Sequence, residues 1–454
     1  MNAPDGHVVI IGAGFSGSLL AINLLRHGGP RVTLIERRAA QIGRGVAYSA
    51  ADPGHLLNVR AGNMSALPDA PDHFTDWLST HRPDVTGGFA PRTVYGTYLQ
   101  HLLNEARAHS GKRLNVIAGE AVALRRTEAG FAVEMDDGIS LAADRVVLAI
   151  GNLPPHTPAG LDPAALPADV YAADPWAGDI AEGLAVDDTV VLLGTGLTAI
   201  DAALLLETRG FRGRILALSR RGLVPRRHVA AGGHPQGLSE RPGGTLSGIV
   251  RSVRRRAREI GWRDAVDELR PVTQMLWSGA DIAARARFLR HLRPFWDVHR
   301  HRLAPSVAAR VDAMCNAGRL AFAAGKIASA TAERAHARLA WRPRHCDVAE
   351  TIRTRRIVNC TGPQGDLLRT REPLLRQLIA DGQIRPDALR LGLDVDAWSH
   401  AIDRDGAVQE HLYCLGPMAR SGLWEVVAVP DLRRQSWDLA RILANAHWVG
   451  GEGL

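Results

Sequence analysis

The chain of 454 residues has few cysteines, few aromatic residues and almost no lysine. None of its four cysteines forms a CxxC pair, which excludes the redox-active disulfide of dithiol flavoprotein reductases and indicates a reducing compartment. Lys112 and Lys326 are the only lysines among 55 basic residues. The arginines are interleaved with acids, and the densest run, 251–258, is typical of a solvated helix face. A net charge of +8 therefore does not by itself predict nucleic-acid binding.

Long apolar runs and catalytic signatures of hydrolases are also missing. The most apolar stretch, 189–206, contains two glycines and an aspartate, so it does not predict a membrane span. No secretory signal precedes the strand-like run that begins at His7, and we expect a cytoplasmic protein with no membrane partner. No HExxH, GxSxG or clustered Cys/His pattern predicts a metal or a catalytic triad.

The most informative motif lies within the first 37 residues. A β-branched run over 7–11 predicts a buried parallel strand, which is followed by a glycine-rich turn, a helix over about 16–26 and a strand over 31–36. The glycines permit a tight bend, a close approach to pyrophosphate and close helix–strand packing, while the helix N-terminus attracts the anion. A carboxylate after the second strand accepts hydrogen bonds from ribose hydroxyls. The residues predicted to bind this first dinucleotide are Gly12, Gly14, Ser16, Gly17, Glu36 and Arg37.

A second copy of the pattern occupies 189–221. Its second strand ends in Ser219, Arg220 and Arg221 instead of an acid. An acid would repel a 2′-phosphate, whereas serine and arginine can bind one, so these residue types favour NADPH and leave NADH open. The residues predicted to bind the second dinucleotide are Gly194, Gly196, Thr198, Ser219 and Arg220.

Two dinucleotide turns in one chain predict a bound FAD in the first and NAD(P)H in the second, so that hydride passes between the rings. Strands that end at Gly151 and Gly362 fit the places where such flavoproteins cross between domains beside the cofactors. Gly416 is expected near the flavin, and Arg420 and Glu425 remain open candidates for the ribityl hydroxyls.

The order of motifs predicts an α/β fold with two Rossmann-type dinucleotide-binding domains. We expect the FAD domain to comprise 1–155 and 350–454. The NAD(P)H domain, 156–349, would then carry a helical insertion over about 249–312. A small substrate is expected in a cleft between such domains.

Several blocks spread over the whole chain resemble one family. They are GRGVAY at 43–48, HLLNV at 55–59, PDHFTDWL at 71–78, GTGLT at 194–198, SRRGL at 219–223, RFLRHLRPFW at 287–296 and the segment 424–435. They resemble the FAD/NAD(P)-binding monooxygenases grouped with FAD-dependent urate hydroxylase and the aspartate N-monooxygenases, and most of all the urate hydroxylase. The resemblance implies a flavin monooxygenase that uses FAD, NAD(P)H and O₂. Arg44 and Tyr48 follow the first βαβ unit, where a loop can reach the flavin, and His55 and Asn58 are expected in a loop aimed the same way. The alternative for these residues is a role in the structure of the loops.

The substrate expected from this resemblance is urate, hydroxylated to 5-hydroxyisourate, or a similar flat anionic heterocycle. The arginine-rich segment 287–305 suits such an anion, and Arg44, Tyr48, Arg293 and His299 are the predicted catalytic residues. The alternative for this segment is a basic surface helix with Phe295 and its apolar neighbours packed inward. N-hydroxylation of an amino acid or other amine is the second functional hypothesis. A nucleic-acid-binding protein with a vestigial nucleotide fold is the third, and the oligomeric state is open.

Overall fold

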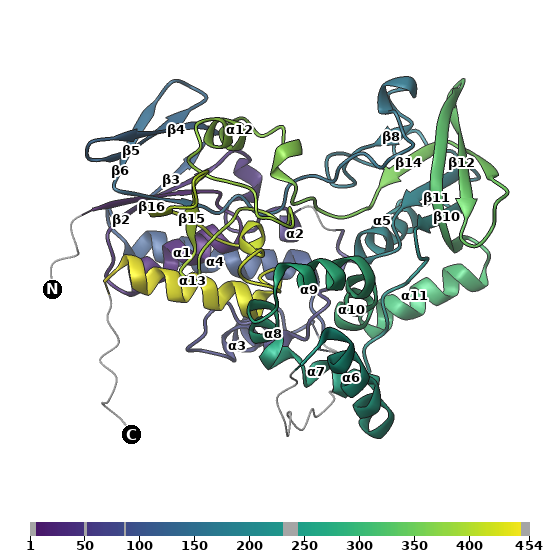
Figure 1. Ribbon diagram of the computed structural model, residues 1–454, viewed down its shortest axis with the longest axis horizontal. Coiled ribbons are helices and arrows are strands. Elements are labelled where there is room, and N and C mark those ends of the chain that lie inside the picture. The colour runs from purple at the N-terminus through teal and green to yellow at the C-terminus, as the bar shows by residue number, and fades with distance from the viewer. Residues whose placement is uncertain (1–5, 50–51, 86–87, 230–243, 446–454) are drawn as a thin grey trace. The chain divides into compact units, whose positions relative to one another are not determined.

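The computed structural model describes residues 6–49, 52–85, 88–229 and 244–445, which form two compact units (Figure 1). The first unit comprises 1–51, 59–153 and 365–454, and the second comprises 52–58 and 154–364. The sequence predicted boundaries near residues 155 and 350, whereas the units divide after residues 153 and 364. It also did not predict that the short segment 52–58 groups with the second unit.

The first unit is built on a six-stranded sheet of order β15-β16-β7-β1-β2-β3. Its five strands from β16 to β3 pair in parallel, and β15 joins the edge in the antiparallel direction. The bounds are β1 (His7–Ile11), β2 (Arg31–Glu36), β3 (Leu114–Ala118), β7 (Arg145–Leu148), β15 (His400–Ile402) and β16 (Val408–Cys414). The central strand β1 is apolar on both faces because both faces are covered.

Helices cover one face of this sheet and a small antiparallel sheet covers the other (Figure 1). The small sheet consists of β4 (Ala121–Thr127), β5 (Gly130–Met135) and β6 (Ser140–Ala143). The helices of the unit are α1 (Phe15–Arg26), α2 (Val46–Ser49), α3 (His73–His81), α4 (Arg92–His109), α12 (Pro373–Ala380) and α13 (Val429–Leu443). One apolar core joins the small sheet and α12 to alternate residues of the large sheet, among them Val9 and Leu148.

The second unit repeats the arrangement on a seven-stranded sheet of order β13-β12-β11-β10-β9-β14-β8. The bounds are β8 (Tyr171–Ala172), β9 (Thr189–Leu193), β10 (Arg214–Ser219), β11 (Leu320–Glu333), β12 (His336–Pro343), β13 (Glu350–Thr354) and β14 (Arg356–Asn359). The strands from β11 to β8 pair in parallel, whereas β11, β12 and β13 form an antiparallel meander. Helix α5 (Leu197–Thr208) connects β9 to β10 as α1 connects β1 to β2.

A helical segment separates β10 from β11, as the sequence predicted. It contains α6 (Leu246–Ile260), α7 (Trp262–Asp267), α8 (Thr273–Ser278), α9 (Ile282–Arg287), a π-helical turn (Phe288–Leu292), α10 (Arg293–Arg300) and α11 (Pro305–Asn316). No residue of α6 is buried, in agreement with a solvated arginine face. The inward packing expected for Phe295 is wrong: its side chain is 44% exposed, and Val298 is the buried residue of α10.

The predicted fold class is confirmed: the chain has an α/β fold with two Rossmann-type dinucleotide-binding sheets. Among the residues that the structure describes, none of the helices has the length and apolar character that crossing a membrane requires.

Candidate functional site

The first glycine turn, at the carboxyl end of β1, packs backbone against backbone. Gly12 has φ +106°, and its N–H donates to Ile35 O at 2.8 Å. A Cβ at Gly12 would lie 2.3 Å from Ala149 O, and one at Gly17 would lie 1.9 Å from Gly12 O. Neither position admits a side chain without moving the backbone, so the close helix–strand packing predicted from the sequence is present.

The Glu36 carboxylate, at the end of β2, is fixed against this turn. It is 9% exposed, its Oε2 accepts the N–H of Ala13 at 3.0 Å, and its Oε1 accepts the N–H of Arg38 at 3.1 Å. Each carboxylate oxygen has a second lone pair. The carboxylate is therefore oriented by the backbone and can still accept hydroxyl donors of a ribose.

The first turn of α1 begins at Gly14, which is the N-cap residue and has extended backbone. The first N–H groups of any α-helix lack helical acceptors, and the helix dipole makes this end attractive to anions. A Cβ at Gly416 would lie 2.9 Å from Ser16 Oγ, so the C-terminal segment passes directly beside this helix turn. Gly416 N–H in turn donates to Gln435 Oε1 of α13 at 2.9 Å.

Aromatic side chains pack beside the same helix N-terminus. The ring of Tyr95, which is fully buried, lies 4.9 Å from that of Tyr48 and 6.4 Å from that of Phe15. Burial raises the pKa of Tyr48 to about 12, so its phenol is neutral at ordinary pH. The neighbouring Arg44 donates from Nη2 to Ala40 O at 3.1 Å, while its buried Nε and Tyr95 Oη have no hydrogen-bond partner among the described residues.

The second glycine turn reproduces the backbone of the first. Gly194 has φ +136°, its N–H donates to Leu218 O at 2.7 Å, and a Cβ there would lie 2.3 Å from Cys360 O. Gly196 is the N-cap of α5, and a Cβ there would meet nothing within 4 Å. Thr198 follows in the first turn of α5 and is partly buried.

Hydroxyl groups replace the carboxylate at the end of β10. We call the end of the second strand of each turn its ribose end, because the adenosine ribose is expected there. Ser219 Oγ lies 2.9 Å from Thr195 Oγ and accepts the N–H of Gly222 at 3.0 Å. The two arginines that follow differ: Arg220 is exposed, whereas Arg221 donates to the carbonyls of Arg290 and His291 at 3.1 and 3.2 Å. Of the pair, Arg220 is thus the one whose guanidinium faces solvent.

Both turns fit the dinucleotides that the sequence predicts. The positive φ angles, the positions that a Cβ would fill and the oriented Glu36 are the features that a pyrophosphate and a ribose require. Gly151 and Gly362 also have positive φ, with nothing within 4 Å of an added Cβ, so the backbone after β7 and after β14 is accessible. Within the described residues, no group of three or more His, Cys, Asp or Glu could hold a metal ion.

Three residues predicted to contact FAD have other partners in the structure. His55 lies in the second unit, where it is 1% exposed and bonds from Nε2 to Asp201 O of α5 at 2.9 Å. Asn58 O, in the same segment, accepts from His228 Nε2 at 3.0 Å. Arg37 is in the first unit and forms an ion pair with Glu372 at 2.5 Å. Their roles toward FAD remain predictions.

The four predicted catalytic residues are divided between the two units. Arg44 and Tyr48 belong to the first unit, and Arg293 and His299 to the helical segment of the second. Arg293 forms an ion pair with Asp297 at 3.4 Å, and His299 Nδ1 lies 2.7 Å from Phe295 O. Their contact with a substrate is likewise a prediction.

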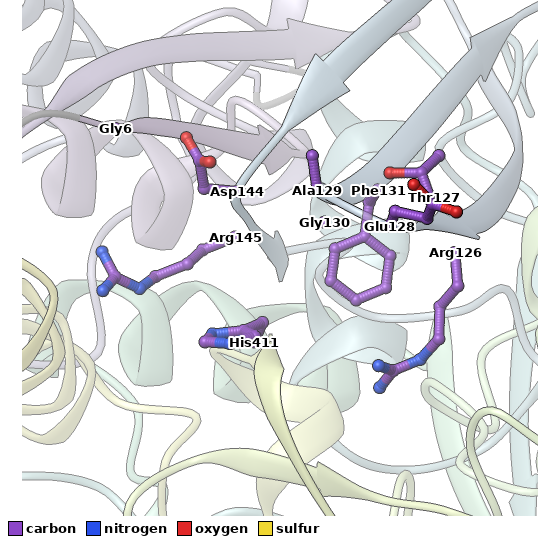
Figure 2. A pocket seen from close by; sticks show the side chains of 10 residues that line it. All are labelled: Gly6, Arg126, Thr127, Glu128, Ala129, Gly130, Phe131, Asp144, Arg145 and His411. Atoms are coloured by element: carbon purple, nitrogen blue, oxygen red, sulfur yellow. The ribbon is translucent and has the colours of Figure 1, made fainter.

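A hollow of about 400 Å³ lies in the first unit. Figure 2 shows Arg145 and His411 on one side of it and Arg126 beside the ring of Phe131. Arg145 begins β7, whereas Ala149 and Gly151 follow its end beside the first glycine turn. The hollow therefore lies at the amino ends of the parallel strands, whereas the turn lies at their carboxyl ends. We do not assign the dinucleotide site to the hollow.

Sequence reasoning missed Thr195 and Gln435, and it grouped Arg221 with Arg220 without predicting its bonds to two carbonyls. Thr195 occupies the variable position of the second GxG, where its hydroxyl matters only because Ser219 is brought beside it. Gln435 lies within a segment that carried the family resemblance, but its bond to Gly416 depends on how α13 packs. The missing acid after the second strand was the one sequence signal for the Thr195–Ser219 pair.

Comparison with protein families supports a dinucleotide-binding role for the region that contains the first glycine turn. Residues 9–153 match a family model described as FAD-NAD(P)-binding, which confirms the cofactors FAD and NAD(P)H predicted for this chain. A comparison with curated proteins finds no match.

Solved structures extend the likeness to nearly the whole chain. Lysine 6-monooxygenase from Pseudomonas syringae has a TM-score of 0.68 at 16% identity, over 97% of this chain and 99% of that one. The ornithine N-hydroxylase of Kutzneria sp. 744, in a structure with reduced FAD, NADP⁺ and L-ornithine, has a TM-score of 0.67 at 14% identity, over 98% and 100%. The cadaverine monooxygenase of Erwinia amylovora has a TM-score of 0.64 at 13% identity, over 96% and 94%.

These likenesses show the fold of the chain. The chain has the fold of the flavin-dependent monooxygenases, as predicted. Within that class, the three similar enzymes named above act on amines, and none of the three is a urate hydroxylase. The resemblance to a urate hydroxylase therefore gains no support from these comparisons.

Proposed function

We propose that the protein is an FAD- and NAD(P)H-dependent monooxygenase that N-hydroxylates a primary amine, either an amino acid or a diamine. The observation that carries the proposal is the pair of glycine turns with different ribose ends. This pair lies within a fold that the chain shares over nearly its whole length with an ornithine N-hydroxylase, a lysine 6-monooxygenase and a cadaverine monooxygenase. The order of the two hypotheses made from the sequence is thereby reversed.

The chain's own residues have separate duties in this proposal. The backbone of Gly12 and Gly14, with the N-terminus of α1, binds the FAD pyrophosphate, and Glu36 holds the adenosine ribose. Gly194 and Gly196, with the N-terminus of α5, bind the pyrophosphate of NAD(P)H. When bound, FAD supplies the redox and oxygen chemistry, and the protein supplies binding, orientation and exclusion of water.

The cysteines favour a monooxygenase over a disulfide reductase on the same fold. Thioredoxin reductase of Lactococcus lactis also matches, with a TM-score of 0.54 at 10% identity. In the present chain all four cysteines are free, and burial raises the pKa of the Cys360 and Cys414 thiols, which keeps them protonated and unreactive. The chain thus lacks the CxxC pair that a dithiol reductase uses.

The ion pairs of the helical segment weaken the case for an anionic substrate. Arg302 pairs with Asp267 at 2.9 Å, and Arg256 pairs with Glu268 at 3.0 Å. Arg293 is paired with Asp297 as well. Because carboxylates neutralise these guanidinium groups, the high arginine content of the segment is weaker evidence for urate than it was in the sequence.

The proposal is tested with the purified, flavin-loaded protein. NADH and NADPH oxidation is followed with ornithine, lysine, cadaverine or urate added, while hydroxylamine and hydrogen peroxide are assayed. We expect an amine to stimulate oxidation and to yield a hydroxylamine in proportion to NAD(P)H consumed. Urate disappearance without amine hydroxylation would replace this substrate class by the first hypothesis. Protein without flavin that binds DNA in a salt-sensitive manner would reject both.

A further inference from the structure

Arg221 is the residue that connects the second glycine turn to the helical insertion. Its Nη1 and Nη2 donate to His291 O and Arg290 O, and its guanidinium carbon lies 5.2 Å from the centre of the Phe295 ring. Arg221 comes two residues after the end of β10, where the adenosine ribose of a second dinucleotide is expected. The π-helical turn 288–292 is thus held beside the ribose end of the site.

The sequence of the insertion explains why the Arg290 carbonyl is available. Pro294 has no N–H, so the carbonyl of Arg290, four residues earlier, loses the donor that a regular α-helix would provide. The backbone widens into a π-helical turn at this point, and the guanidinium of Arg221 donates to the Arg290 carbonyl in place of the missing N–H. Aromatic stacking of Phe295 on Arg221 adds to the attachment.

Backbone hydrogen bonds continue the attachment along the chain. Arg226 N–H donates to Val298 O at 2.9 Å, Leu303 N–H donates to Arg226 O at 2.8 Å, and His228 N–H donates to Leu303 O at 2.9 Å. The strand-like segment after the second turn is therefore joined to the insertion at several points, and the insertion has a fixed place next to β10.

We propose that this attachment makes the insertion part of the nicotinamide site, with Arg290 joining Arg220 as a second cation that binds the 2′-phosphate of NADPH. Both side chains are exposed, and the Arg290 carbonyl contacts the residue that follows Arg220. Two guanidinium groups match the charge of a phosphate dianion. Arg221 is then a positioning residue that does not touch the phosphate. The inference rests on the proposed function and specifies its second cofactor.

The test uses full-length, flavin-loaded protein and two probes that differ only in the phosphate, 2′,5′-ADP and 5′-AMP, with affinities measured by calorimetry. We expect Arg290→Ala and Arg220→Ala each to weaken 2′,5′-ADP binding about tenfold while 5′-AMP binding is unchanged. Arg254→Ala, an exposed arginine of α6 in the same insertion, is the matched control and should alter neither affinity. Unchanged 2′,5′-ADP binding in Arg290→Ala would overturn the proposal.

A double-mutant cycle tests the positioning role of Arg221. If Arg221 acts through Arg290, the double variant Arg221→Ala/Arg290→Ala binds 2′,5′-ADP no more weakly than Arg290→Ala alone. Losses that add in full would show that the two residues act independently and would contradict the positioning role. Thermal unfolding of each variant identifies any loss of 2′,5′-ADP affinity that arises from misfolding. If Arg221→Ala misfolds, Arg221→Lys, which keeps the charge, replaces it in the cycle.

Two further outcomes separate this inference from the proposed function. If the wild type binds the two probes equally, the phosphate site is rejected, while amine hydroxylation supported by NADH would leave the monooxygenase intact. If 2′,5′-ADP is preferred and lost in Arg290→Ala but no amine is hydroxylated, the phosphate site is supported and the substrate class fails.

Discussion

The two glycine turns share a backbone and differ in the side chains around it. Gly12 and Gly194 have the same kind of positive φ, the same donor to the neighbouring strand and the same close approach to a carbonyl, of Ala149 or Cys360. At the third position of the motif, however, the first turn has Gly17 and the second has Ala199. The backbone of the turn is thus set by where the chain must bend, whereas the helix behind it can approach more or less closely.

The ribose ends differ more than the turns. In the first turn a carboxylate, Glu36, accepts the N–H of Ala13; in the second, Ser219 and Thr195 hydroxyls meet at the equivalent place. A negative charge is suited to ribose hydroxyls, while a neutral pair followed by Arg220 tolerates a phosphate. If the two cofactors bind as predicted, one backbone serves both because the groups that distinguish them lie at the end of the second strand.

The largest effect is expected from Gly17→Ala. Its Cβ would lie 1.9 Å from Gly12 O, so α1 must move away from the turn. We expect protein without flavin, or insoluble protein, as measured by the ratio of flavin to protein absorbance. The matched change Ala199→Gly should keep the flavin and cost about 1 kcal/mol of stability. Flavin content that is normal in Gly17→Ala would contradict the assignment of the first turn.

Valine at the two N-cap glycines should separate the two cofactors. Gly14→Val puts a branched side chain where the pyrophosphate approaches, with its Cβ 3.3 Å from Gly45 Cα, and should give colourless protein. Gly196→Val enters open space and should leave the flavin bound. The Gly196 variant is instead expected to lose flavin reduction by NAD(P)H, measured by stopped-flow absorbance, while dithionite still reduces its flavin. Equal flavin loss in both variants would show that the sites are not independent.

Ser219→Asp places an acid at the ribose end of the second turn, as in the first. Repulsion of the 2′-phosphate should raise the KM for NADPH by at least about tenfold, equivalent to about 1.4 kcal/mol, and leave or lower the KM for NADH. Ser219→Ala is the control, because it loses the bonds to Thr195 and Gly222 without adding charge. An equal rise for both nucleotides in Ser219→Asp would mean that this position does not read the phosphate.

The smallest effect concerns Tyr48, beside the first turn. Burial raises the pKa of Tyr48 to about 12 in the folded state, above the ordinary value near 10. Between pH 10 and 12 the unfolded chain therefore releases this proton first, and stability is lost as the pH rises. Tyr48→Phe should reduce the loss between pH 9 and 11 by about 1 kcal/mol, measured by urea unfolding. The same pH dependence in both proteins would show that Tyr48 is not the group responsible.

Much of the fold and of the two turns could be predicted because their signals are local. A buried strand, a glycine that needs positive φ and a helix that begins within three residues form one short segment, as at 7–17 and 189–199. The match to an FAD-NAD(P)-binding family model agrees with this reasoning. The contacts of His55 could not be foreseen, because its segment lies in the sequence of the first unit but packs with the second.

The sequence by itself determined the two dinucleotide turns, the missing dithiol and the acid that distinguishes one turn from the other, since each depends on residues adjacent in the chain. Only the tertiary structure decided which arginines are engaged. Arg220 and Arg221 are neighbours of the same type, yet one is exposed and the other binds carbonyls about 70 residues away. A side chain's charge is fixed by its chemistry, but its partners depend on the long-range packing that brings the Arg290 carbonyl, which has lost its donor at Pro294, close to Arg221.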